Sequence, residues 1–172
     1  MSEPGAAERI AEITLDERTV LRRSPEIERE RAGAIADLVD ANRFAPVSGL
    51  AGPFRVHLST AEGRLAMDVA SLADGGGDET IQMPLRPFAG LIKDYFLICE
   101  SYSKVSRGGN LGQVEAIDMG RRGLHDEAAG LLVDCLAAKV AIDHATARRL
   151  FTLICVLHLK APTHGLGAHQ RP

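Results

Sequence analysis

Hydrophobic and polar positions alternate along the first half of the chain, which is the pattern of half-buried strands. Two alternating runs, 54–58 and 65–69, flank a turn-like segment at 60–63, and together they predict a β-hairpin. A further alternating run covers 81–85, and residues 9–15 indicate a short strand. We therefore expect a small antiparallel sheet of about four strands.

One helix interrupts this strand-rich half. Ser24 and Pro25 are typical of a helix start, and Asn42 and Pro46 mark its end. Between these signals, apolar side chains recur at helical spacing at Ile27, Ala34, Ile35, Leu38 and Val39.

The second half has the 3.6-residue periodicity of helices. One helix is expected from Pro87 to the 107–109 segment, and a second begins at Asn110. Gly120 and Gly123 favour a bend or a break in this second helix. Asp143 is a suitable cap for a last helix whose body, 150–157, is apolar nearly all round. Such a helix belongs in the middle of a core.

These elements predict an α+β fold. The chain has 172 residues, which is enough for one domain with a hydrophobic core and too short for two ordinary ones. We expect a single domain over 1–160, mainly sheet plus one helix in 9–86 and helical in 87–159. The segment 161–172 is rich in Gly, Pro and His, and we expect it to be a disordered tail.

Charge and composition narrow the function classes. The net charge of −3 argues against non-specific nucleic-acid binding. No apolar run approaches the roughly 20 residues of a membrane span, and the N-terminus lacks the features of a secretory signal. Cys99, Cys135 and Cys155 lie in apolar helical stretches, so we interpret them as buried, reduced thiols. A cytoplasmic protein without a membrane association is expected.

The segment 115–127 is the best candidate for chemistry. In a continuous helix Asp118, Arg122 and His125 share one face, and such a set can bind an anion or relay a proton. The two glycines would let a backbone or a ligand approach closely. The plainer interpretation is a solvated face with an Asp118–Arg122 ion pair. The candidate ligand- or partner-binding residues are Asp118, Arg121, Arg122, His125 and Asp126.

Other chemistries find less support in the sequence. His125 and Asp126 are adjacent and point about 100° apart on a helix, and the remaining histidines are scattered, so no metal site is expected. There is no Gly-x-Ser-x-Gly sequence, and the apolar surroundings of the cysteines favour protonated thiols. We therefore expect no catalytic residues and no cofactor, and we favour a non-enzymatic protein over an enzyme.

The segment 136–150 is similar to the helix-turn-helix of repressors. It has two helical halves, a short turn, a polar cap at Asp143, and Arg148 and Arg149 on the second half. The turn lacks its usual glycine, and the second helix continues into the apolar 153–157 stretch. These features and the low net charge make nucleic acid an unexpected partner.

Three blocks of the sequence resemble one bacterial family. They are Lys93–Tyr102, Glu115–Glu127 and Thr146–His158, supported by ITLDE and SPEIERERAGAIADLVDANRFAP nearer the N-terminus. The chain is identified by them as similar to an uncharacterised protein family of the UPF0262 type. The resemblance implies no established activity. It does imply that the 115–127 segment belongs to the family's pattern.

The leading hypothesis is a non-enzymatic binding or regulatory protein that uses the 115–127 surface to hold a protein or a small anionic ligand. The alternative is an enzyme acting on a phosphorylated or carboxylated small molecule. Arg121 or Arg122 would then clamp the anion, with His125 or Asp118 as acid or base. DNA binding through 136–150 is the second alternative. The sequence leaves the ligand and a homo-oligomeric state open.

Overall fold

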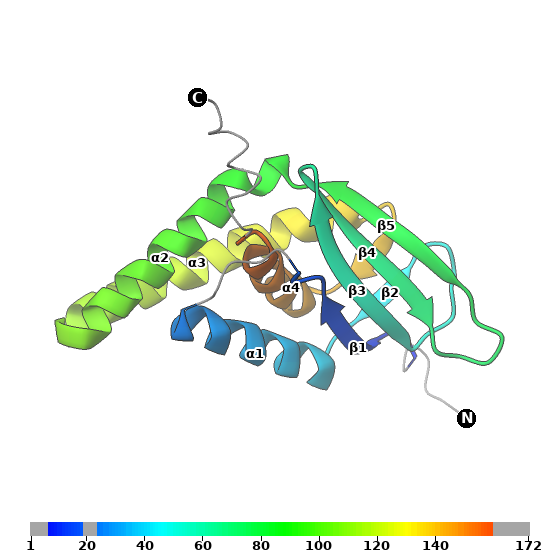
Figure 1. The fold of residues 1–172 in the computed structure, drawn as a ribbon, viewed down its shortest axis with the longest axis horizontal. Helices are drawn as coiled ribbons and strands as arrows, with labels where there is room; N and C mark the ends of the chain where they lie inside the picture. Colours follow the sequence, from blue (N-terminus) through cyan, green and yellow to red (C-terminus); the bar gives the residue numbers. More distant parts are fainter. Residues whose placement is uncertain (1–6, 19–23, 160–172) are drawn as a thin grey trace.

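The computed structural model describes residues 7–18 and 24–159. The tail expected at 161–172 lies outside the described residues. Within them the α+β class is confirmed: a four-stranded mixed sheet covers one side of a group of helices (Figure 1).

The four-stranded sheet has the order β1-β3-β4-β5. Its strands are β1 (Ile10–Leu15), β3 (Phe54–Ala61), β4 (Arg64–Ser71) and β5 (Asp78–Pro84). The expected hairpin is present, and its turn residues Glu62 and Gly63 both have positive φ, 54° and 75°, as a tight two-residue hairpin turn requires. The expectation of a wholly antiparallel sheet is wrong: the sheet is mixed, because β1 pairs with β3 in parallel. A parallel pair needs a crossover, and helix α1 (Pro25–Asp40) lies in that connection.

A second, two-stranded sheet was not expected from the sequence. Strands β2 (Phe44–Pro46) and β6 (Val140–Ile142) pair in an antiparallel manner. Each has only three residues, which is too short for an alternating pattern to stand out. This pair joins the chain that leaves α1 to the chain that enters the last helix.

The helix boundaries follow the capping signals. The Ser24 hydroxyl accepts a hydrogen bond from the Ile27 amide at 3.2 Å and starts α1. A 3-10 turn, η1 (Arg86–Phe88), precedes α2 (Ala89–Gly108). Asn110 and Gln113 form a reciprocal capping box at the start of α3 (Leu111–Leu136). The Asp143 carboxylate accepts from the Thr146 amide at 2.9 Å and starts α4 (His144–Leu157).

The bend or break that Gly120 and Gly123 favour does not occur, because α3 is one continuous helix. A helical glycine costs only about 1 kcal/mol, and packing of α3 against α2 and α4 outweighs it. Nothing lies within 4 Å of a Cβ built on either glycine, so neither makes room for a close backbone contact.

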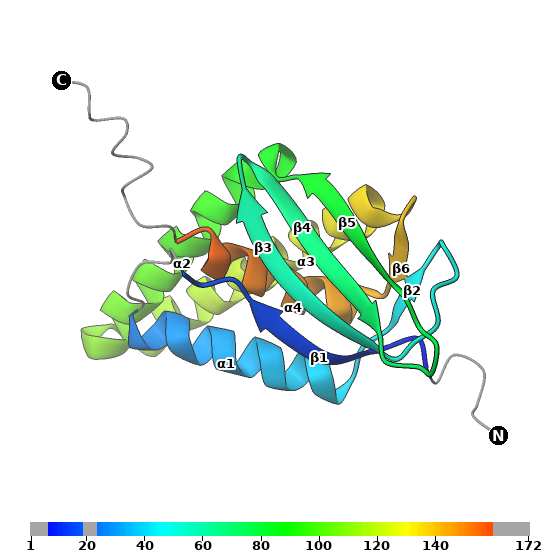
Figure 2. The same ribbon diagram turned by 45° about the vertical axis from the view of Figure 1, so that its right-hand side comes forward.

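Helix α4 occupies the middle of the core, as its apolar sequence predicts. Every residue from Leu150 to Leu157 is buried. The helix has α1 on one side and α3 on the other, with the four-stranded sheet across it (Figure 2). Buried side chains from the strands and from all four α-helices belong to one hydrophobic cluster. The C-terminal end of α2 and the N-terminal end of α3, which meet at the turn between them, extend beyond this body (Figure 1).

Two further expectations are corrected by the fold. The segment 136–150 is not a helix-turn-helix, since its first half contains a turn and strand β6 instead of a helix. Its second half is the start of α4, where Ala147 and Leu150 are buried in the core. Cys135 is exposed rather than buried, because it lies on the outer side of α3, whereas Cys155 is buried and Cys99 half-buried. All three cysteines are free thiols.

Candidate functional site

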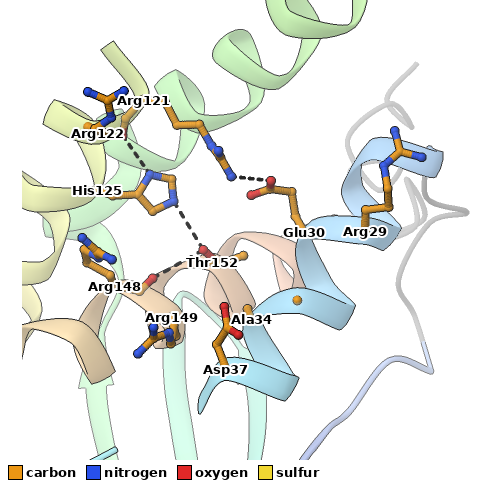
Figure 3. A pocket seen from close by; sticks show the side chains of 11 residues that line it. Arg29, Glu30, Ala34, Asp37, Arg121, Arg122, His125, Arg148, Arg149 and Thr152 are labelled. Carbon is orange, nitrogen blue, oxygen red and sulfur yellow. Dashed lines mark hydrogen bonds and ion pairs between the residues drawn. The ribbon is translucent and has the colours of Figure 1, made fainter. Parts of the chain in front are cut away.

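A pocket of about 290 Å³ opens where α1, α3 and α4 meet (Figure 3). Each helix contributes residues spaced by about one turn, which is why they share one wall. Arginines dominate the lining: Arg29 from α1, Arg121 and Arg122 from α3, and Arg148 and Arg149 from α4. The only lining carboxylates among the described residues are Glu30 and Asp37. The pocket therefore carries an excess of positive charge.

Most of these arginines have no close carboxylate partner in the part of the chain that the structure describes. Within the described parts of the chain, Arg29, Arg122 and Arg149 have no carboxylate oxygen within 4 Å. Arg148 reaches Asp126 only at 4.0 Å, and both of these side chains are largely exposed. Guanidinium groups left without partners around a concave surface provide donors suited to carboxylate or phosphate oxygens.

Arg121 differs from the other arginines of the pocket because it is ion-paired with a carboxylate that also lines the pocket, Glu30. The second carboxylate oxygen of Glu30 accepts a hydrogen bond from the Tyr95 hydroxyl at 3.3 Å. Burial opposes the charge of Arg121, but the hydrogen bond and the charge of Glu30 outweigh it, so the pKa of Arg121 lies above its ordinary value. Burial, more than any other cause, raises the pKa of Tyr95, which therefore remains a neutral donor.

His125 has a defined tautomer. Its Nδ1 lies 2.9 Å from the carbonyl oxygen of Arg121, and a carbonyl can only accept, so Nδ1 carries the proton. Its Nε2 then holds a lone pair that faces the Thr152 hydroxyl at 3.3 Å, as Figure 3 shows. The ring also makes edge contacts with Tyr95 and Phe151, both at 5.8 Å between centroids. Burial lowers the pKa of His125 and favours this neutral form.

The structure brings three of the five predicted site residues together. Arg121, Arg122 and His125 line the pocket, whereas Asp118 and Asp126 do not. Asp126 lies outside it and bonds to His144 Nε2 at 3.2 Å. Asp118 has the same helical phase as His125 but lies two turns away along α3, beyond the pocket. It forms no ion pair with Arg122.

Residues of two other helices complete the pocket, and the sequence interpretation missed them. Arg29, Gly33 and Asp37 recur at every fourth position of α1, which is a weak signal of a common stripe. The sequence places Arg148 and Arg149 only in the helix-turn-helix pattern of 136–150, and not with the 115–127 segment. Their neighbour in the pocket, Thr152, is only 6% exposed and sits among core residues, so no sequence pattern marks it.

The described residues do not meet the requirements of a metal site or of a membrane-spanning helix, and the half-buried Cys99 is not a reactive thiol. Among 7–18 and 24–159, no three His, Cys, Asp or Glu side chains are grouped so that they could hold a metal ion. None of the helices in this part of the chain combines the length and the apolar character that a membrane crossing demands. Burial also raises the pKa of the Cys99 thiol to about 11, which makes it a weak nucleophile at neutral pH.

The fold and the pocket define an α+β protein with an arginine-lined concavity between three helices. The profile of the uncharacterised protein family UPF0262 matches residues 7–160, and the chain belongs to this family. A UPF0262 protein of Rhodospirillum rubrum is 53% identical over 151 residues, covering 88% of this chain and 92% of the relative. A UPF0262 protein of Erythrobacter litoralis is 48% identical over 159 residues, covering 90% and 99%. No solved structure is significantly similar to the chain.

Proposed function

We propose that this protein is a non-enzymatic binding protein whose ligand is a small molecule with several negative charges. The single observation that supports this most is the pocket between α1, α3 and α4, where five arginines face two carboxylates. A concave site suits a small ligand better than the flat surface of a protein partner. We assign the anion to Arg29, Arg122 and Arg149, which have no carboxylate within 4 Å among residues 7–18 and 24–159.

The chemistry of the lining favours phosphate among anions. The guanidinium groups come from three different helices, and a tetrahedral phosphate offers three or more oxygens to such donors. A single carboxylate would occupy one such arginine and leave the others unpaired. The ligand class we infer is therefore a phosphorylated small molecule, bound in a reducing compartment such as the cytoplasm, to which three free cysteines are suited.

Binding of inorganic phosphate and pyrophosphate, measured by isothermal titration calorimetry at constant ionic strength, tests the proposal. We expect the Arg122→Gln/Arg149→Gln double variant to bind at least about tenfold more weakly, since each charge-assisted hydrogen bond contributes about 1.5–3 kcal/mol. The matched control is Arg64→Gln/Arg86→Gln, which removes the same charge from exposed positions outside the pocket. Equal binding by the two double variants would show that the pocket is not the anion site.

One observation keeps an enzymatic function as the second candidate. The neutral His125 presents its Nε2 lone pair to Thr152 at 3.3 Å beside the arginines, which is the arrangement of a general base held by a backbone carbonyl. Neither Asp118 nor the α2 carboxylates Asp94 and Glu100 line this pocket. Incubation with a bound phosphate ester, followed by phosphorus NMR, distinguishes the two functions. Turnover that His125→Phe abolishes would establish an enzyme.

A further inference from the structure

A second pocket of about 300 Å³ lies directly beside the arginine pocket. Arg29, Glu30 and Arg121 line both of them, so the Glu30–Arg121 ion pair is a shared wall between the two spaces. The second pocket extends from this wall toward α2. Both pockets are open to solvent, so a ligand that occupies both spaces passes over this ion pair on their open side.

The lining of the second pocket differs in character from that of the first. Its α2 side is formed by Ile98 and Cys99, both half-buried, and by the ring of Tyr102, which is 40% exposed. An apolar wall with a partly exposed aromatic ring provides a surface on which a planar group can stack. Tyr102 is not needed to fill the core, since it is among the exposed large hydrophobic residues.

Hydrogen-bond acceptors complete the lining of the second pocket. Glu26 and Glu30 of α1 present carboxylates, which can accept hydrogen bonds from amino or ring N–H groups of a ligand. A hydrogen bond from the Ser103 hydroxyl is the main reason that the pKa of Glu26 lies below its ordinary value. Carboxylate acceptors beside an aromatic ring are unsuited to a second phosphate group and suited to a heterocycle with N–H donors.

We propose that the two pockets form one site for a nucleoside monophosphate, with the phosphate among the arginines and the base between Tyr102 and Glu26. This proposal rests on the proposed function, because the phosphate end uses the same arginines. Arg29 lies at the junction and can contact the phosphate from the wall that both pockets share. In this arrangement the Glu30–Arg121 pair lies between the two ends of the ligand.

Calorimetric titration of the full chain with AMP, ribose 5-phosphate and inorganic phosphate tests the assignment. We expect AMP to bind at least about tenfold more tightly than ribose 5-phosphate, from stacking of the base on Tyr102. Tyr102→Ala should remove this advantage and leave the affinity for inorganic phosphate unchanged. Tyr102→Phe keeps the ring and should keep the advantage.

The outcomes separate this proposal from the proposed function. If phosphate binds through Arg122 and Arg149 but AMP binds no more tightly than ribose 5-phosphate, the nucleotide assignment is wrong and the anion site stands. If AMP binds with full advantage in Tyr102→Ala, the base lies elsewhere and the assignment is again overturned. If none of the three compounds binds, the anion site itself fails.

Discussion

The guanidinium of Arg121 on α3 is ion-paired with the carboxylate of Glu30 on α1, a residue that lies 91 positions earlier in the chain. Tyr95 on α2 donates to the other oxygen of the same carboxylate. Three helices are thus connected through one side chain, and that side chain stands in the wall between two pockets. Stability and ligand binding should therefore both depend on Glu30.

Replacing Glu30 should destabilise the fold. In Glu30→Ala, Tyr95 loses its acceptor while its ring stays buried, and Arg121 loses its counter-ion. We expect the free energy of unfolding to fall by about 1–3 kcal/mol, near the lower end because 42% of the Arg121 side chain is exposed to water. Urea unfolding followed by circular dichroism measures this. Glu115→Ala, at an exposed position of α3, is the control and should change stability little.

The stability of the protein should depend on pH through His125. Burial lowers the pKa of His125 in the folded protein below the value of about 6.5 for an unfolded histidine. The unfolded chain therefore binds the proton more tightly, so the stability that the neutral ring provides is fully present above about pH 6.5. It is lost progressively as the pH falls from there through the lower folded pKa.

The His125→Phe variant tests this pH dependence, because it retains a ring against Tyr95 and Phe151. Thermal melting between pH 5 and 7.5 should show a smaller loss of stability on acidification than in the wild type. His57→Gln, which changes a histidine that hydrogen-bonds Thr14 on the sheet, away from the pocket, is measured beside it for comparison. An unaltered slope in His125→Phe would mean that another group carries the acid sensitivity.

Asn42 holds the first strand against the first helix. Its side-chain oxygen accepts from the Ile10 amide at 2.7 Å, and its amide nitrogen donates to the carbonyls of Ile10 and Leu38 at 2.9 and 2.7 Å. We expect Asn42→Ala to cost about 1–3 kcal/mol, because partly buried backbone groups lose their partners. Asn42→Asp should cost at least as much, since a carboxylate would face two carbonyl oxygens. Chemical denaturation of both variants measures the order of their stabilities. An Asn42→Asp variant as stable as the wild type would contradict the hydrogen-bond roles given to the Asn42 side chain.

Gly33 lines the arginine pocket from the middle of α1, and nothing lies within 4 Å of a Cβ built there. Gly33→Ala should therefore stabilise the protein by about 0.5–1 kcal/mol, as expected for alanine in a helix interior. Gly33→Trp places a large ring at the pocket and should reduce phosphate binding. Gly120→Trp, at a position with equal open space outside the pocket, should not reduce it. Equal phosphate affinity in the two tryptophan variants would argue against a ligand in this pocket.

Much of the fold could be predicted because its signals are local. The caps at Ser24, Asn110 and Asp143 act within four residues of chain, and the hairpin turn at Glu62 and Gly63 depends on two backbone conformations. The burial of α4 followed from its own composition. The parallel pairing of β1 and the short β2–β6 pair could not be predicted, since both depend on contacts between distant segments.

The candidate site also has one part that local sequence signals predict and another part that depends on contacts between distant segments. The chain by itself determined that Arg121, Arg122 and His125 lie within one turn of one helix, because helical periodicity places them there. Only the tertiary structure decided that this turn faces Arg29 of α1 and Arg149 of α4 across a pocket, and that Asp118 lies outside it. The physical reason is that the packing of α1 and α3 against the buried α4 sets which helix faces meet. That packing depends on the whole core and on no local sequence pattern.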